Sequence, residues 1–277
     1  MNIIISSHKV DNGKEPFISV VMSCHNSKKR LKTSIESILD QTYKNFEFII
    51  IDDGSTDDTL DIIRGYSASD RRIKIIEKPN TGLADSLNEG IKIAKGGWIA
   101  RMDADDVSFV DRFEKQIEFI KKNPEIDVLG TGAVLISPNN EIQNSILLSE
   151  RHEQITKDIF KRTIIFHSSV IMKKAFFEKV GGYDTNLLRS QDFDLWLKGI
   201  KLGHKYHNLQ CVLLKYYTNN YKRMLKDVKD KFISALIITF RYRYFRKGLS
   251  WALMELFRGV FINLGWYGSR SLKKVGR

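Results

Sequence analysis

The sequence places three carboxylates within four positions, Asp103, Asp105 and Asp106, directly after the hydrophobic residues 98–102. Carboxylates this close repel one another unless a positive charge lies among them. Mg²⁺ and Mn²⁺ fit such a cluster because they take oxygen ligands and bridge carboxylates to phosphates. Three carboxylates are also more than the N-terminus of a helix needs. The cluster therefore predicts a divalent-metal site that serves a phosphate-bearing ligand.

A second acidic pair, Asp52 and Asp53, ends another hydrophobic run, residues 46–51. On its own, this pair is equally consistent with a turn, because residues 54–56 are Gly, Ser and Thr and lead into a helical pattern. Beside the first cluster, two acidic strand ends in one domain favour a site for a metal and a nucleotide over a solvated surface.

The elements that must position these carboxylates alternate along the chain. Short hydrophobic runs typical of buried strands are separated by segments whose apolar residues recur at helical spacing. Strands are expected at residues 17–22, 46–51, 73–76, 98–102, 126–136 and 168–172. Helices are expected between successive strands among the first five and at residues 174–179 and 192–202, and a polar excursion is expected at residues 137–163. This order predicts an α/β fold with a doubly wound, mainly parallel sheet flanked by helices. Ligands of such sheets bind beyond the carboxyl ends of the strands, where both acidic clusters lie.

Composition and charge narrow the class of protein. The chain has 277 residues, 42% of them hydrophobic, which is enough for a large core and argues against global disorder. Only Cys24 and Cys211 are present, so a disulfide framework is disfavoured and a reducing cytoplasm is indicated. Residues 215–277 hold 15 Lys and Arg against 3 Asp and Glu, a net charge of +12 that equals the charge of the whole chain. The basic charge therefore serves a partner of the C-terminal segment.

Six motifs occur in an order that is informative as a set. They are residues 18–26 (ISVVMSCHN), 51–57 (IDDGSTD), 103–106 (DADD), 167–170 (HSSV), 181–184 (GGYD) and 191–196 (QDFDLW). This set resembles the family 2 glycosyltransferases with the GT-A fold, and the resemblance covers residues 16–215. Two aspartates separated by one residue are weak evidence for this family on their own, whereas six motifs in the same order are specific to it.

The resemblance implies transfer of a sugar from a nucleotide diphosphate sugar, with a UDP-sugar as the expected donor, to an acceptor hydroxyl with inversion at the anomeric carbon. It implies Mn²⁺ or Mg²⁺ on Asp105, where the metal neutralises the diphosphate leaving group. It also implies Asp192 as the general base that takes the proton of the acceptor hydroxyl. The residues implied to hold the nucleotide sugar are Ser23, His25, Asn26 and Asp53, with Asp103 on the ribose or behind the metal. The implied setting is synthesis of a surface polysaccharide or lipooligosaccharide on a glycan or lipid-linked acceptor.

Two residues depart from the family pattern. His25 stands where the family usually has an aromatic residue, often Tyr, and an imidazole can still stack on a base. Gln191 stands where the family usually has Glu, so the residue beside Asp192 keeps its hydrogen bonding and loses its charge. Asp194 is the alternative base, but residues i and i+2 of a helix face different ways, so the two carboxylates are not expected to reach one hydroxyl.

The C-terminal segment is expected to be a separate, basic unit. The division expected from the sequence is a lead-in (residues 1–15), a GT-A domain (16–215) and a helical tail (216–277). Residues 232–240 are too few to span a bilayer, and two charges interrupt the longer apolar stretch, residues 249–268. The apolar residues of that stretch recur on one helical face between Lys, Arg, Tyr and Trp, which is typical of a helix on an anionic membrane surface. The tail is expected to contact the inner face of the cell membrane; the alternative is a helix packed on the catalytic domain.

Three other functions are alternatives to glycosyl transfer. A sugar-1-phosphate nucleotidyltransferase has a similar nucleotide site, but that class usually opens with a glycine-rich phosphate loop, which residues 23–26 do not form. A nucleic-acid-binding protein is disfavoured because the body of the chain is neutral. The intact carboxylates disfavour a catalytically silent relative that binds a glycan or nucleotide. This alternative nevertheless stays open, because Gln191 stands where the family usually has Glu.

Overall fold

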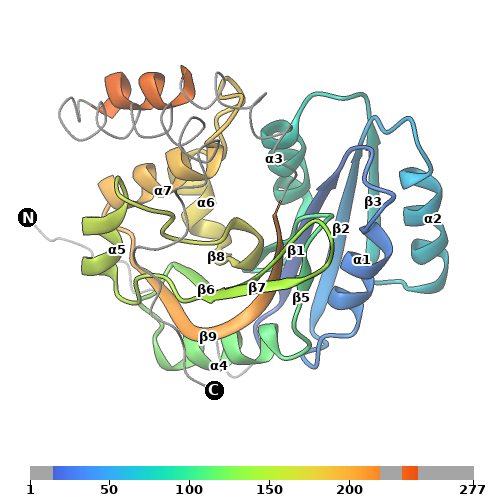
Figure 1. Ribbon diagram of the computed structural model, residues 1–277, viewed down its shortest axis with the longest axis horizontal. Coiled ribbons are helices and arrows are strands. Elements are labelled where there is room, and N and C mark those ends of the chain that lie inside the picture. The colour runs from blue at the N-terminus through green and yellow to red at the C-terminus, as the bar shows by residue number, and fades with distance from the viewer. Residues whose placement is uncertain (1–14, 219–232, 243–277) are drawn as a thin grey trace, which may run out of the picture.

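A nine-stranded mixed sheet forms the centre of the protein in the computed structural model, which describes residues 15–218 and 233–242 (Figure 1). The strands lie in the order β3-β2-β1-β4-β8-β6-β9-β5, with β7 paired to β6 outside this path. The strands are β1 Ile18–Cys24, β2 Phe46–Asp53, β3 Ile73–Lys78, β4 Trp98–Arg101, β5 Val107–Ser108, β6 Val128–Ile136, β7 Ile142–Ile146, β8 Ile171–Lys173 and β9 Tyr206–Tyr217. The helices are α1 Leu31–Leu39, α2 Thr59–Ser69, α3 Leu83–Ile93, α4 Arg112–Lys122, α5 His152–Asp158, α6 Lys174–Val180 and α7 Gln191–Lys201, and residues 233–242 are also helical.

The half of the sheet that carries the acidic motifs is parallel. β3, β2, β1 and β4 pair in parallel, with Cys24 opposite Asp52 and Asp53 opposite Lys78. All eight residues of β2 are buried, as expected for a strand covered on both faces. Parallel strands bring their carboxyl ends to one edge, so the loops after β1, β2 and β4 meet there. The predicted α/β fold with a mainly parallel sheet is confirmed, while β4 with β8, β8 with β6 and β5 with β9 pair antiparallel.

Helices cover both faces of the sheet because alternate residues of each strand point to opposite sides. On one face, Val20 and Met22 pack in a core with residues of α1, α2 and α4. On the other face, Val21 packs in a core with residues of α3, α5, α6, α7 and the 233–242 helix. Full burial of an aliphatic side chain contributes about 1.5–3 kcal/mol, so these two cores stabilise the strands whose ends carry the acidic motifs.

The described structure differs from the sequence-based expectation at three places. Residues 137–163 contain β7, which forms a hairpin with β6, and α5, rather than a purely irregular excursion. Residues 206–217 form β9, a strand that the pattern did not indicate, because its burial is irregular and its pairing with β6 shifts register near Gly132. Residues 167–169 form a 3₁₀ turn, so the strand that follows is only Ile171–Lys173.

Part of the tail packs on the α/β unit. Ala235 and Ile238 are fully buried, and in Figure 1 the 233–242 helix lies over α7. No helix within residues 15–218 and 233–242 is both long and apolar enough to cross a bilayer. The expected interfacial helix, residues 249–268, lies outside the described residues, as do residues 1–14 of the lead-in.

Candidate active site

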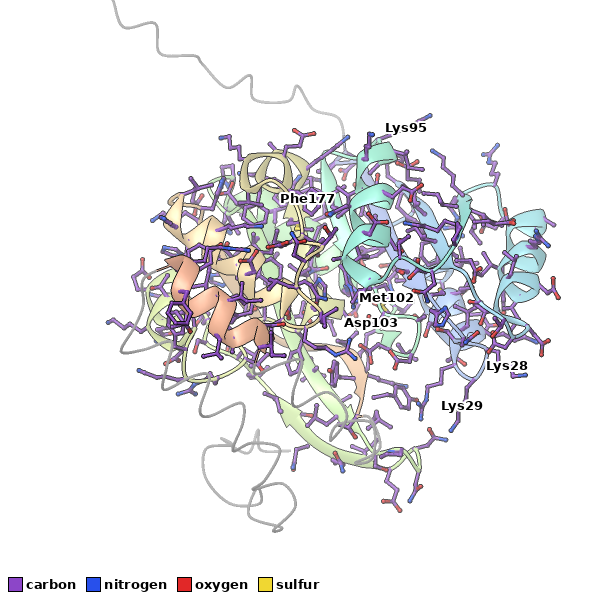
Figure 2. The ribbon with its side chains drawn as sticks, turned by 90° about the horizontal axis from the view of Figure 1, so that it is seen from above. Lys28, Lys29, Lys95, Met102, Asp103 and Phe177 are labelled. Atoms are coloured by element: carbon purple, nitrogen blue, oxygen red, sulfur yellow. The ribbon has the colours of Figure 1, made fainter. Side chains whose placement is uncertain are left out.

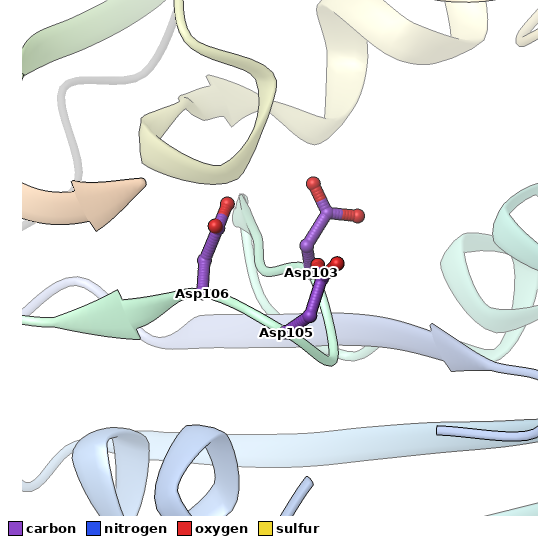
Figure 3. Close-up of side chains that lie close together, drawn as sticks. All are labelled: Asp103, Asp105 and Asp106. Carbon is purple, nitrogen blue, oxygen red and sulfur yellow. The ribbon is translucent and has the colours of Figure 1, made fainter. Parts of the chain in front are cut away.

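The three clustered carboxylates follow β4, in the loop that leads to β5. One oxygen from each of Asp103, Asp105 and Asp106 lies within 4.8 Å of the others (Figure 3). Asp103 and Asp105 are half-buried, whereas Asp106 is buried. In the view from above, Met102 and Asp103 lie near the middle of the molecule (Figure 2). Three carboxylate oxygens at this spacing suit a hard divalent cation, so the residues present fit the expected metal.

A buried cation holds the first of these carboxylates. Arg101, the last residue of β4, is 2% exposed and pairs with Oδ2 of Asp103. The Arg101 guanidinium also donates to Oγ of Ser168 at 3.1 Å, and the Ser168 hydroxyl contacts the same Asp103 oxygen. Burial by itself raises the pKa of Asp103, but the charge and hydrogen bond of Arg101 outweigh it and lower that pKa. Asp103 is therefore an anion at neutral pH.

Asp106 has a different role from its two neighbours. Its Oδ1 accepts the backbone N–H of Tyr217 at 2.9 Å, and its Oδ2 contacts the Ser168 hydroxyl. Burial, reinforced by the charges of Asp103 and Asp105, raises the pKa of Asp106 well above its ordinary value. Asp106 thus fastens the acidic loop to the end of β9, and the half-buried Asp103 and Asp105 are better placed to meet a ligand.

The residues expected to hold the nucleotide lie at the end of β1, against the loop after β2. Nδ1 of His25 lies 2.9 Å from the carbonyl oxygen of Asp53, which can only accept, so Nδ1 donates in this contact. Asn26 adopts a φ of 49° and its Oδ1 accepts the backbone N–H of Thr56 at 2.8 Å. His25 and Asn26 are exposed and Ser23 is half-buried. The structure therefore brings these predicted residues together at one edge.

Asp53 joins the end of β2 to the start of α3. Its Oδ1 accepts the backbone N–H of Thr81 and its Oδ2 that of Gly82, each at 2.9 Å. The Thr81 hydroxyl also lies 3.5 Å from Oδ1, and Asp53 is 3% exposed, so Oδ2 is the oxygen that keeps a lone pair for a further hydrogen bond. The neighbouring Asp52 is 3% exposed, and its Oδ1 has no hydrogen-bond partner among the described residues. A buried acceptor without a partner is unusual, so Asp52, which the sequence placed in the second acidic pair without a role of its own, is a candidate ligand contact.

The two acidic strand ends belong to one site. Cys24, which ends β1, is buried, and burial followed by the charges of Asp52, Asp103 and Asp105 raises the pKa of its thiol. A Cβ at Gly54, whose φ is 70°, would lie 2.6 Å from the backbone nitrogen of Asn80. Glycine therefore permits the close approach of the loops after β2 and β3, which completes this edge.

Asp192 reaches the same region from the first turn of α7. It is half-buried, and burial raises its pKa above the ordinary aspartate value. The charge of Arg101 lowers that pKa and the charge of Asp103 raises it. Asp192 therefore lies close enough to the acidic loop for charges there to shift its pKa. After burial, the charge of Asp192 also raises the pKa of Tyr183, whose hydroxyl lies 2.7 Å from Nε2 of His167.

The residues on either side of Asp192 have structural partners. Nε2 of Gln191 donates to the carbonyl of Leu187 at 2.7 Å. A glutamate in the same conformation would set a carboxylate oxygen against a carbonyl oxygen, so glutamine suits this position better than glutamate. Asp194 is 0% exposed and its oxygens lie 2.9 Å from Nζ of Lys198 and 2.9 Å from the hydroxyl of Tyr242. The buried Asp194 is not accessible to an acceptor, so the alternative in which it acts as the base is not supported.

Two supporting residues were missed from the sequence. Arg101 could have been found, because it is the one charged residue in the hydrophobic run 98–102. Ser168 lies in the motif at residues 167–170, but no role was predicted for it from the sequence, because its contacts with Asp103 and Asp106 join residues more than 60 positions apart.

Comparison with known proteins identifies the family. The family model described as glycosyl transferase family 2 matches residues 19–181. The chain belongs to glycosyltransferase family 2. The putative glycosyltransferase EpsE of Bacillus subtilis is 40% identical over 205 residues, which cover 72% of each chain. The O-antigen biosynthesis glycosyltransferase WbnJ of Escherichia coli is 36% identical over 208 residues, which cover 73% of this chain and 80% of WbnJ.

Solved structures support the fold of this family 2 glycosyltransferase. S. aureus TarS 1–349 in complex with UDP superimposes with a TM-score of 0.62 at 19% identity, over 78% of this chain and 65% of that one. The mannosyltransferase PcManGT from Pyrobaculum calidifontis, in complex with GDP-Man and Mn²⁺, gives a TM-score of 0.63 at 17% identity, over 93% of this chain and 77% of that one. At these identities the likeness shows a shared GT-A fold.

Proposed function

We propose that this family 2 glycosyltransferase moves a sugar from a nucleotide diphosphate sugar, with UDP as the expected nucleotide, to a hydroxyl of a glycan or lipid-linked acceptor. The transfer inverts the anomeric carbon and serves surface polysaccharide or lipooligosaccharide synthesis. The observation that carries this proposal is the cluster of Asp103, Asp105 and Asp106. It lies at the edge of the sheet where β1 and β2 also end. The name of WbnJ, an O-antigen biosynthesis enzyme, supports the setting.

The donor side of the proposed site is the edge formed by β1, β2 and β4. His25 and Asn26 are exposed on the β1 loop, and His25 contacts the backbone carbonyl of the buried Asp53 at the end of β2. We assign Ser23, His25, Asn26 and Asp53 to the base and ribose, with Asp103 on the ribose or behind the metal. The complex of TarS with UDP supports a uridine nucleotide, whereas PcManGT was solved with GDP-Man, so the nucleotide is a point for experiment.

The metal is assigned to Asp105, with Asp103 beside it. A bound Mn²⁺ or Mg²⁺ supplies Lewis-acid stabilisation of the charge that develops on the departing diphosphate. The chain itself keeps Asp103 anionic, because the buried Arg101 lowers the pKa of that carboxyl. The Mn²⁺ in the PcManGT complex supports a metal of this type.

The proposed chemistry is a single in-line displacement. The acceptor oxygen forms the new bond to the anomeric carbon while the bond from that carbon to the diphosphate breaks, which inverts the centre. The acceptor proton passes to a carboxylate oxygen of Asp192, and the electron pair of the broken bond leaves with the nucleoside diphosphate. The raised pKa of Asp192 suits this role because a stronger base takes the proton more readily.

Nucleotide-dependent stability tests this proposal. A ligand present at about a hundred times its dissociation constant adds about 2.7 kcal/mol to the free energy of unfolding. We expect UDP to raise the melting temperature of the full chain in Mn²⁺ and not in chelator, with GDP, CDP and dTDP as comparisons. A metal-dependent shift with a different nucleotide would change the donor class. No shift with any of the four would overturn the proposal as an active enzyme, and a shift without turnover of any nucleotide sugar would favour a silent relative.

We also propose that the protein acts at the cytoplasmic face of the cell membrane, through its basic tail. Residues 215–277 carry the whole net charge of +12, and the sequence of residues 249–268 has apolar residues at helical spacing between basic residues. Sedimentation with vesicles tests this: the full chain is expected to pellet with anionic and not with neutral lipid, more weakly in 0.5 M salt. A chain ending at Tyr242 is expected to stay in solution, and equal pelleting of both chains would refute a role for residues 243–277.

A further inference from the structure

A buried carboxylate lies two residues after the proposed base. Asp194 is 0% exposed in the first turn of α7, where an acidic group is favoured by the helix dipole. Burial removes it from water, so it must be compensated by nearby charges and donors. Lys198 supplies one such partner from the same helix, at 2.9 Å. The remaining partners come from the tail.

The 233–242 helix supplies those partners. A guanidinium nitrogen of Arg241 lies 3.1 Å from Oδ1 of Asp194, and the hydroxyl of Tyr242 donates to the same oxygen at 2.9 Å. The tail thus provides two of the three groups seen around this carboxylate among the described residues. Ala235 and Ile238 are fully buried in the same core as Trp196 of α7, so this contact is a packed interface rather than a loose surface pair.

The same helix also holds the loop that leads into α7. Arg241 pairs with Asp184 at 2.6 Å, so one guanidinium links both ends of the stretch that contains Asp192. The hydroxyl oxygen of Ser234 accepts the backbone N–H of Arg189 at 3.3 Å. α7 is entered through Ser190, whose φ of 61° is uncommon for a residue other than glycine. Backbone in this region persists only where surrounding contacts hold it.

We propose that the 233–242 helix is a positioning element of the transfer site, in which Arg241 and Tyr242, acting through Asp194 and Asp184, fix the first turn of α7 and so the direction of the Asp192 carboxylate. Neither residue touches a substrate in this role. Residues i and i+2 of a helix face different ways, so Asp194 can be locked into the tail interface while Asp192 faces the site. The inference rests on the proposed function of Asp192 as the base.

The experiment compares the full chain with Arg241→Met, Tyr242→Phe and the double variant. The control is Arg64→Met, which removes an arginine paired with Glu77 at 2.7 Å on the exposed side of α2. Hydrogen exchange, read on peptides from residues 184–196, is expected to be faster in the first three and unchanged in the control. Peptides from β1 and β2 are expected to keep their protection in all variants, which separates local release from global unfolding.

Turnover provides the second measurement. Release of nucleoside diphosphate in Mn²⁺ is expected to fall about tenfold to a hundredfold in kcat with little change in the donor KM, since small misplacements of a reacting group have effects of this size. Tyr242→Phe keeps the packing and removes one hydroxyl, so it reports on positioning even if Arg241→Met unfolds. Unchanged exchange of residues 184–196 in the double variant, or an unchanged kcat, would overturn the inference. Failure of the wild-type chain to bind any nucleotide would instead count against the proposed function, and the exchange data would still decide whether the helix holds α7.

Discussion

Replacing Asp105 with asparagine is expected to slow sugar transfer by about a thousandfold. A metal that stabilises the leaving diphosphate contributes several kcal/mol to the transition state, and about 4 kcal/mol corresponds to three powers of ten. Asparagine keeps the size of the side chain and one oxygen, but it removes the charge that holds the cation. The half-buried position of Asp105, within 4.8 Å of the other two carboxylates, is the reason to expect so large an effect from one residue.

The measurement is release of nucleoside diphosphate from the donor chosen by the stability test, in Mn²⁺ and in chelator. The Asp105→Asn protein is also expected to lose the metal dependence of its nucleotide-induced stabilisation. Asp61→Asn is the matched control, because the Asp61 side chain is 81% exposed on α2, away from the site. An Asp105→Asn protein that kept transfer within about tenfold of wild type, with the same response to chelator, would remove Asp105 as the metal ligand.

The parts of the fold that could be predicted are those that depend on the local pattern of hydrophobic and polar residues. β1, β2 and β4 are buried on both faces, so each appears as a short continuous hydrophobic run. The carboxylates that follow β2 and β4 then had to meet at one edge, because parallel strands place their carboxyl ends together. This is why the two acidic clusters could be assigned to one site from the pattern of the sequence, whereas the β1 loop was assigned to that site through the family resemblance.

The parts that could not be predicted depend on pairings between distant residues. β9 pairs along its length with β6, yet its sequence carries a buried Asn208 that donates to the carbonyls of Ser149 and Ile164, which breaks the usual alternation. The interface of Arg241 and Tyr242 with Asp194 joins residues 47 and 48 positions apart, and no local spacing encodes it. Sequence patterns report the periodicity of an element, whereas these contacts arise only when elements pack.

Replacing Asp192 with asparagine is expected to reduce transfer by about 10²- to 10⁴-fold while nucleotide binding in Mn²⁺ is retained. The base acts only when it is deprotonated. Since burial raises the pKa of Asp192, wild-type kcat is expected to rise with pH through a value above that of an ordinary aspartate and then to level off. In Asp192→Asn, the residual rate is expected to lose this rise with pH, the acidic limb of the profile. A variant that kept the limb, or transferred at a rate within about tenfold of wild type, would show that another group accepts the proton.

Stability separates this role of Asp192 from a structural one. With its pKa raised in the folded state, Asp192 binds more protons folded than unfolded between the two pKa values, so its contribution to stability is present at low pH and is lost as the pH rises through that window. Asp192→Asn is therefore expected to melt at or above the wild-type temperature at pH 7. Asp194→Asn, in the same turn, is expected to melt lower, because it weakens the pairing with Lys198 and Arg241. If Asp192→Asn lowered the melting temperature as much as Asp194→Asn, loss of transfer would follow from a disturbed α7 and not from a missing base.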